Sequence, residues 1–142
     1  MRAFERIQTP VWIGGLAGLI PFYASIYGIG ALNWPLWSFL SYAWIILAFL
    51  CGSVWRTAME DGTAEGVMAG FATALGVPAL LWLSYWLAPA LQLGLTALGF
   101  IAVYLWERVY SWESFPAGYR VLRTTLTTLV LLAHLILVLT VL

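Results

Sequence analysis

Long apolar segments alternate with short polar or turn-forming connections along the whole chain. A helix needs about 20 apolar residues to cross a hydrocarbon core of about 30 Å, and each segment is close to that length. The pattern therefore predicts an all-α polytopic membrane protein, a single domain (residues 1–142) built as a bundle of five transmembrane helices. The expected spans are about 11–32, 35–55, 66–87, 90–106 and 120–142.

Proline and glycine interrupt this pattern at a few positions. Pro21 lies in the middle of the first span and Pro78 within the third, and each removes one helix hydrogen bond. We therefore expect both helices to kink. Gly62 is expected to end the helical stretch between the second and third spans.

Small residues recur within the apolar segments, often four positions apart. In lipid such spacing favours close approach of helix backbones and van der Waals packing. The predicted helix-packing positions are Gly14, Gly18, Ala48, Gly52, Gly66, Gly70 and Ala74.

The composition agrees with a membrane protein. The 142 residues are 63% hydrophobic and 8% charged, against about 45–50% and about 25% in soluble domains. The net charge is zero and the chain has no lysine. Because no basic stripe is present to neutralise phosphates, nucleic acid is not an expected partner, whereas the lipid bilayer is.

Charged residues fall on one side of the predicted bundle. The arginines are Arg2, Arg6, Arg56, Arg108, Arg120 and Arg123. The positive-inside rule predicts that this side, with the N-terminus, is cytoplasmic, or faces the matrix in a mitochondrion, and that the C-terminus lies opposite. The expected location is a multi-pass position in the bacterial inner (cytoplasmic) membrane.

The predicted cytoplasmic charged face has two interpretations. Its members are Arg56, Glu60, Asp61, Glu65, Glu107, Arg108, Glu113, Arg120 and Arg123. Arg56 and Glu60 are four residues apart, a spacing at which helix side chains form ion pairs. The charges are either solvated surface groups, which is the usual role of such residues, or a docking surface for a partner subunit.

One face of the second span carries two indoles around two small residues. Trp44, Ala48, Cys51 and Trp55 share that face, and the indoles are roughly 16 Å apart along the helix. Such a recess accommodates either a neighbouring helix or a flat apolar ligand. The candidate ligand-binding residues are Tyr42, Trp44, Cys51 and Trp55. A hydrogen bond to a neighbouring helix is the alternative for Tyr42, and a packing role is the alternative for Cys51.

Residues able to carry chemistry are scarce. We expect no Asp, Glu, Lys or Arg within the spans beyond the arginines that open the last one, which argues against ion-coupled transporters and proton pumps. His134 has no second histidine to share a metal or haem, so a hydrogen bond across helices is the simpler role. We therefore expect no catalytic residue, no metal site, no cofactor and no enzymatic activity.

Several stretches resemble the transmembrane protein 69-like family of small proteobacterial and mitochondrial membrane proteins, a domain of unknown function. They are Gly15–Phe22, Tyr42–Trp55, Ala97–Phe100 with Glu107 and Arg108, and Pro116–Arg123. The family pattern has Gly-Gly, an aliphatic residue, His or Arg, then Trp; here Cys51, Ser53 and Val54 replace its first, third and fourth positions. The resemblance implies a five-helix protein of an inner membrane and implies no reaction.

Two functions follow as hypotheses. The first is a non-enzymatic accessory subunit or assembly factor of a larger respiratory or photosynthetic membrane complex. The second is a binder or carrier of a flat apolar small molecule, such as a quinone, sterol or tetrapyrrole. That second hypothesis is an analogy with tryptophan-rich five-helix translocator proteins.

Overall fold

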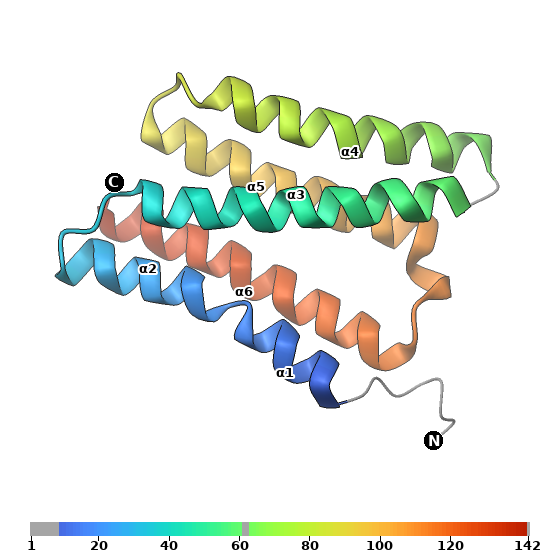
Figure 1. The fold of residues 1–142 in the computed structure, drawn as a ribbon, viewed down its shortest axis with the longest axis horizontal. Helices are drawn as coiled ribbons and strands as arrows, with labels where there is room; N and C mark the ends of the chain where they lie inside the picture. The colour runs from blue at the N-terminus through green and yellow to red at the C-terminus, as the bar shows by residue number, and fades with distance from the viewer. Residues whose placement is uncertain (1–8, 61–62, 142) are drawn as a thin grey trace.

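The structure, a computed structural model, describes residues 9–60 and 63–141. Their helices lie side by side, and the five spans run in alternately opposite directions, with α1 and α2 forming the first of them (Figure 1). The elements are α1 (Thr9–Ala17), α2 (Ile20–Ala31), α3 (Trp37–Glu60), α4 (Ala64–Ser84), α5 (Pro89–Trp106), the π-helix η2 (Glu107–Ser111), the 3₁₀-helix η3 (Trp112–Ser114) and α6 (Ala117–Val141).

Five helical segments of the described chain are long and apolar enough to cross a membrane, which confirms the all-α five-helix prediction. They are Pro10–Ala31, Trp37–Glu60, Ala64–Ser84, Pro89–Ser114 and Ala117–Thr140. The largest departure from the expected bounds is in the fourth span, which continues past Trp106 through η2 and η3. The protein is therefore an integral multi-pass membrane protein.

The first span is broken rather than bent. α1 ends at Ala17, and Pro21 lies in the first turn of α2, where its missing N–H and fixed φ favour the start of a helix. The carbonyl of Gly18, at this break, accepts a hydrogen bond from the Tyr42 hydroxyl at 2.8 Å. In contrast α4 continues through Pro78 as one helix, because a membrane helix tolerates the loss of one backbone bond.

The buried residues of α3 form a stripe with helical spacing. They are Phe39, Leu40, Ala43, Leu47, Cys51, Val54 and Ala58. α4 and α5 pack against it on one side and α2 on another. Cys51 is therefore a packing residue of the core, as the alternative interpretation of it proposed.

Glycine allows the closest approach between α3 and α4. A Cβ added at Gly70 would lie 2.5 Å from the Ala58 Cβ and 3.0 Å from the Trp106 ring. Gly66 and Ala74, one turn to either side, are also buried. This part of the predicted small-residue face therefore packs inside the chain.

Other predicted packing glycines lie on open faces. A Cβ at Gly14 or Gly52 would meet no described atom within 4 Å beyond its own helix, and Ala48 is exposed. At Gly18 the nearest atom is the Gly15 carbonyl oxygen of the same segment. Gly14 and Gly52 therefore contact no other helix within the described residues, and helix packing at Gly14, Gly52 and Ala48 stays a prediction, because residue spacing does not say which side of a helix the neighbours occupy.

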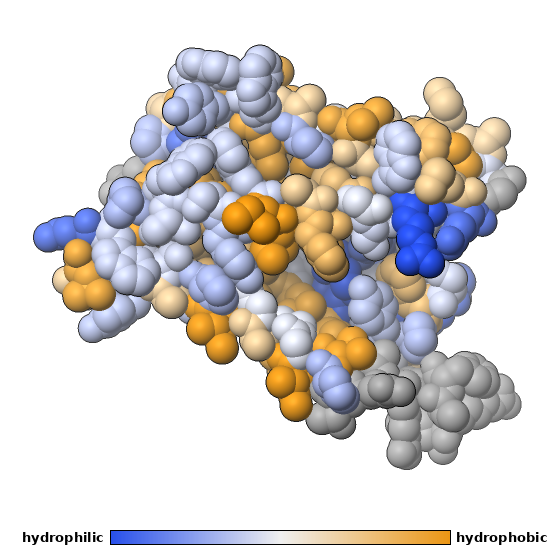
Figure 2. All heavy atoms as spheres, in the orientation of Figure 1, coloured by the Kyte–Doolittle hydropathy of each residue, from blue (hydrophilic) through white to orange (hydrophobic). Residues whose placement is uncertain are grey.

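Described charged residues gather at one end of the bundle, where α3 and α5 end and α4 and α6 begin (Figure 1). Figure 2 shows strongly hydrophilic residues at that right-hand end, with a smaller hydrophilic spot near the α2–α3 connection. α1 begins at the charged end and α6 finishes at the opposite one. The predicted charges Arg2, Arg6 and Asp61, and Gly62, lie outside the described residues.

Candidate functional site

A recess of about 200 Å³ lies on the outer surface between α3 and α4. Trp44 and Ala48 of α3 line it together with Pro78, Leu81 and Trp82 of α4. The two helices are antiparallel (Figure 1), so that Trp44 meets the end of α4 that carries Trp82. The predicted recess therefore exists at its Trp44 end, and α4 supplies its second wall.

Contacts to α5 and to the start of α3 hold the Trp44 side chain in place. Its indole Nε1 donates a hydrogen bond to the Thr96 hydroxyl of α5 at 3.1 Å. The Trp37 ring packs edge-on against it, with ring centroids 4.9 Å apart. An indole held in this way forms a fixed wall of the recess rather than a mobile cover.

The other three candidate ligand-binding residues do not line this recess. Trp55 lies farther along α3 and stacks on Phe71 of α4 at 4.5 Å. Cys51 is only 3% exposed and points into the core. Tyr42 bonds to the break between α1 and α2, because residues two apart on a helix face different sides. The four predicted residues are therefore not one pocket.

A stripe of small and then charged residues runs along the exposed side of α3. Ala48 and Gly52 are exposed, and Arg56 and Glu60 follow at the same four-residue spacing. Arg56 Nε lies 3.5 Å from Glu60 Oε1, and both side chains are exposed, by 80% and 67%. We call Ala48, Gly52, Arg56 and Glu60 the α3 outer stripe.

The remaining exposed charges fasten the connections at the charged end. Tyr110 donates a hydrogen bond to Glu65 across the bundle at 3.2 Å. Arg120 donates to the carbonyls of Trp112 at 2.9 Å and Glu113 at 3.1 Å, so that it clamps η3 onto the start of α6.

Aromatic side chains also make contacts at the charged end of the bundle. The Arg108 guanidinium lies 4.6 Å from the centroid of the Trp112 ring, a cation–π contact. Trp106 Nε1 donates to the Gly66 carbonyl at 3.3 Å. These contacts give much of the predicted charged face a structural role within the chain.

Glu107 and Arg123 form a buried ion pair that the sequence analysis missed. Arg123 Nε lies 2.8 Å from Glu107 Oε2, and the side chains are only 7% and 6% exposed. Both lie inside candidate spans, so the expectation that the spans carry no charged residue beyond the arginines that open the last one is wrong. Glu107 continues the buried side of α5 that carries Val103 and Trp106, and the two opposite charges compensate each other.

A periodic signal for this burial was present in α6. Arg123, Thr127, Val130, His134 and Leu137 follow at helical spacing, and all five are buried. Arg123 therefore shares the core-facing side with His134 rather than the solvated side. The prediction treated Arg123 only as a charge at the start of a span and did not use its helical spacing with His134.

His134 lies in an aromatic environment near the middle of the bundle. Its Nδ1 donates to the Val130 carbonyl of its own helix at 2.8 Å, so the predicted bond across helices is wrong. Phe39 and Phe100 pack against its ring, with centroids at 4.9 and 5.6 Å. Its Nε2 has no hydrogen-bond partner among the residues that the structure describes.

No metal-binding cluster is found in the described ranges, where no three His, Cys, Asp or Glu side chains come close enough to hold an ion.

Comparison with known proteins gives a family and no function. A family model described as a protein of unknown function (DUF3429) matches residues 7–139, nearly the whole chain. The match does not carry the name of the transmembrane protein 69-like family, so that finer resemblance stays a prediction. No curated protein and no solved structure matches the chain.

Proposed function

The chain belongs to the DUF3429 family of proteins of unknown function, and we propose that it is a non-enzymatic accessory subunit or assembly factor of a larger membrane complex. Its α3 outer stripe would pack against a helix of that complex, in an inner membrane with the charged end on the cytoplasmic or matrix side. Support for this proposal comes from the exposed faces of the bundle, and above all from Gly52.

Gly52 is the observation that carries the proposal. It meets no neighbour within the described chain, yet glycine inside a helix costs about 1 kcal/mol relative to alanine. With Ala48 it forms a small-xxx-small pair on a lipid-facing side, the pattern that lets two membrane helices approach closely. A helix from another protein would fill the space that this chain leaves open.

Two charged residues of α3 support partner binding on the same surface. The exposed Arg56–Glu60 pair extends the α3 outer stripe to the membrane boundary. Exposed ion pairs contribute little to the stability of a protein by themselves, about 0–1 kcal/mol. A partner helix lying along Ala48 and Gly52 would reach this pair at its end, where opposite charges on the partner would fix its register.

Comparative co-purification tests the proposal. Tagged wild-type protein, Gly52→Leu and Gly30→Leu would be extracted gently from native membranes and their associated proteins identified by mass spectrometry. Gly30 is a matched control because it is also an open helix glycine, on α2. We expect a stoichiometric partner with the wild type and Gly30→Leu and its loss with Gly52→Leu. A wild-type protein that always purifies alone would contradict the proposal.

A second function, binding of a flat apolar molecule, is favoured by the recess between Trp44 and Trp82. Its volume of about 200 Å³ is below the about 300–1,000 Å³ of drug-sized pockets. It suits a single ring, such as a quinone headgroup, better than a sterol or a tetrapyrrole. Trp82→Ala is the clean test, because Trp82 is 65% exposed, whereas Trp44→Ala also removes the Thr96 bond. Unchanged retention of a quinone by Trp82→Ala would exclude this site.

A further inference from the structure

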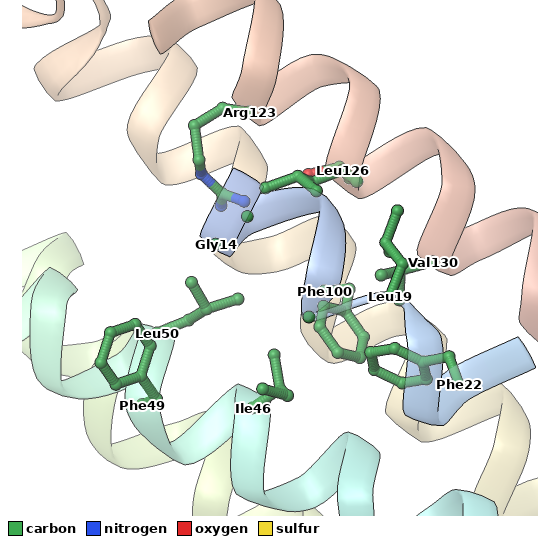
Figure 3. A pocket seen from close by; sticks show the side chains of 13 residues that line it. Gly14, Leu19, Phe22, Ile46, Phe49, Leu50, Phe100, Arg123, Leu126 and Val130 are labelled. Atoms are coloured by element: carbon green, nitrogen blue, oxygen red, sulfur yellow. The ribbon is translucent and has the colours of Figure 1, made fainter. Parts of the chain in front are cut away.

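A second cavity of about 200 Å³ lies on the other side of α3, among α1, α2, α5 and α6. Its larger apolar lining residues include Leu19, Phe22, Ile46, Phe49, Leu50 and Phe100. Figure 3 shows their side chains around an open space, with the Arg123 side chain reaching from α6 toward Gly14 of α1. Figure 2 shows a hollow in the same face, between the parts of the surface that belong to α3 and α1.

The wall is apolar except at one end, where Arg123 and Thr127 lie one helical turn apart on α6. Both residues are more than nine-tenths buried. Glu107 holds the guanidinium by Nε at 2.8 Å, which fixes its position. The polar end of the cavity is thus built from side chains with a defined geometry.

At this end of the cavity the side chains have more hydrogen-bond donors than acceptors that they bond to. Within residues 9–60 and 63–141, the guanidinium makes no other hydrogen bond than the one to Glu107, and the Thr127 hydroxyl makes none. Among the described side chains only His134 Nε2 is both enclosed and without a partner, so the unpaired donors of Arg123 and Thr127 open onto the cavity, where few groups of a bilayer interior can satisfy them. The cavity therefore calls for an occupant with an acceptor oxygen at the Arg123 end.

The charges of Arg123 and Glu107 indicate which kind of acceptor oxygen fits the site. Arg123 and Glu107 neutralise each other, so a carboxylate or phosphate placed there would meet the Glu107 charge as well as the Arg123 charge. A neutral carbonyl oxygen accepts from both donors without that repulsion. Phe22 and Phe100, with ring centroids 6.1 Å apart, form an aromatic wall around the body of the occupant.

We propose that this cavity binds an apolar molecule one ring or one chain wide, whose neutral carbonyl oxygen accepts hydrogen bonds from Arg123 and Thr127. Its volume is too small for a macrocycle or a sterol. Two molecules of a membrane supply this chemistry: a quinone, through its ring carbonyl, and a phospholipid, through an acyl ester. The site is separate from the α3 outer stripe, so either proposal can fail without the other.

Glycine variants test occupancy without disturbing the fold. Gly14 lines the cavity, and a Cβ there would meet no described atom within 4 Å beyond its own helix, so Gly14→Leu adds bulk at the cavity wall with no clash at its Cβ. Gly30→Leu adds the same side chain on an open face away from it. Glu107→Leu/Arg123→Met removes both charges together, and Thr127→Val removes the hydroxyl.

The experiment is native mass spectrometry of protein released from native-lipid nanodiscs, followed by titration with decyl-benzoquinone in quinone-free nanodiscs. We expect the wild type and Gly30→Leu to retain one quinone or one phospholipid, identified by mass. Gly14→Leu should lose it. If the mass is a quinone, the double variant should bind decyl-benzoquinone about 10- to 100-fold more weakly, and Thr127→Val about threefold to tenfold more weakly.

A quinone and a phospholipid give distinct results, and either result supports a site that binds a carbonyl oxygen. A retained phospholipid that Gly14→Leu and the double variant lose identifies the ester as the ligand, and decyl-benzoquinone should then bind weakly to all variants. The proposal is overturned if the wild type retains nothing. It is also overturned if Gly14→Leu retains as much as Gly30→Leu, or if the charge-free variant keeps wild-type retention.

Discussion

Breaking the buried ion pair should destabilise the protein far more than breaking the exposed one. Arg123 Nε and Glu107 Oε2 are 2.8 Å apart and both side chains are buried. At that distance two unit charges attract by about 6 kcal/mol with an effective dielectric constant of 20, a gain that desolvation of both groups offsets. Arg123→Met leaves Glu107 buried without a partner, at an expected cost of about 3–5 kcal/mol.

The assay is SDS-induced unfolding followed by far-ultraviolet circular dichroism, which gives the free energy of unfolding for each variant. Glu107→Leu should cost about as much as Arg123→Met, whereas Glu107→Leu/Arg123→Met should recover most of the loss. Arg56→Met, in the exposed pair, is the matched control and should cost about 0–1 kcal/mol. A loss below about 1 kcal/mol for both buried single variants would refute the reasoning, since it would mean that water solvates the remaining charge.

Three further predictions concern other parts of the bundle. Gly70→Ala places a Cβ 2.5 Å from the Ala58 Cβ and should lower the free energy of unfolding by about 1–3 kcal/mol in the same assay. Its control, Gly52→Ala on an open face, should be neutral or slightly stabilising. Equal effects of the two variants would contradict the α3–α4 contact. Tyr42→Phe removes the donor to the Gly18 carbonyl and should cost about 1 kcal/mol, and an unchanged free energy of unfolding would show that another group satisfies that carbonyl. In a Cys51→Ala background, a membrane-impermeant maleimide should label Asn33→Cys from outside intact cells and Glu113→Cys only after lysis; the reverse pattern would invert the topology.

The helical spans could be predicted from the sequence because their signal is local. Length and hydropathy decide whether a segment crosses the bilayer, and neither depends on which helix lies beside it. A kink at Pro21 was predicted, whereas the helix breaks just before it, at Gly18 and Leu19, because proline favours the first turn of a helix. The continuation beyond Trp106 was missed, because η2 and η3 carry charged residues that resemble a loop in sequence.

The candidate sites were harder to predict because each needs a tertiary neighbour. Trp44 and Ala48 were expected to line a recess, but its second wall, Pro78 and Trp82, depends on how α4 is aligned with α3. Gly52 and Gly70 have similar small-residue spacing, yet one faces open space and the other Ala58.

Charge pairing is nonlocal in the same way. Glu107 and Arg123 are sixteen residues apart, and only the fold brings them together in the core. The helical spacing of Arg123 with His134 indicated burial of the arginine, but it did not identify its partner.

Site-specific photo-crosslinking in native membranes tests the central claim, that the α3 outer stripe packs against another protein, most directly. A benzoylphenylalanine would replace Ile45, one turn from Ala48 and 64% exposed, or, as a control, Leu139 of α6, 74% exposed. We expect position 45 to give one crosslinked protein of defined mass that Gly52→Leu abolishes, and position 139 to give lipid adducts alone. Lipid adducts alone at position 45, or the same protein adducts at both positions, would contradict the claim.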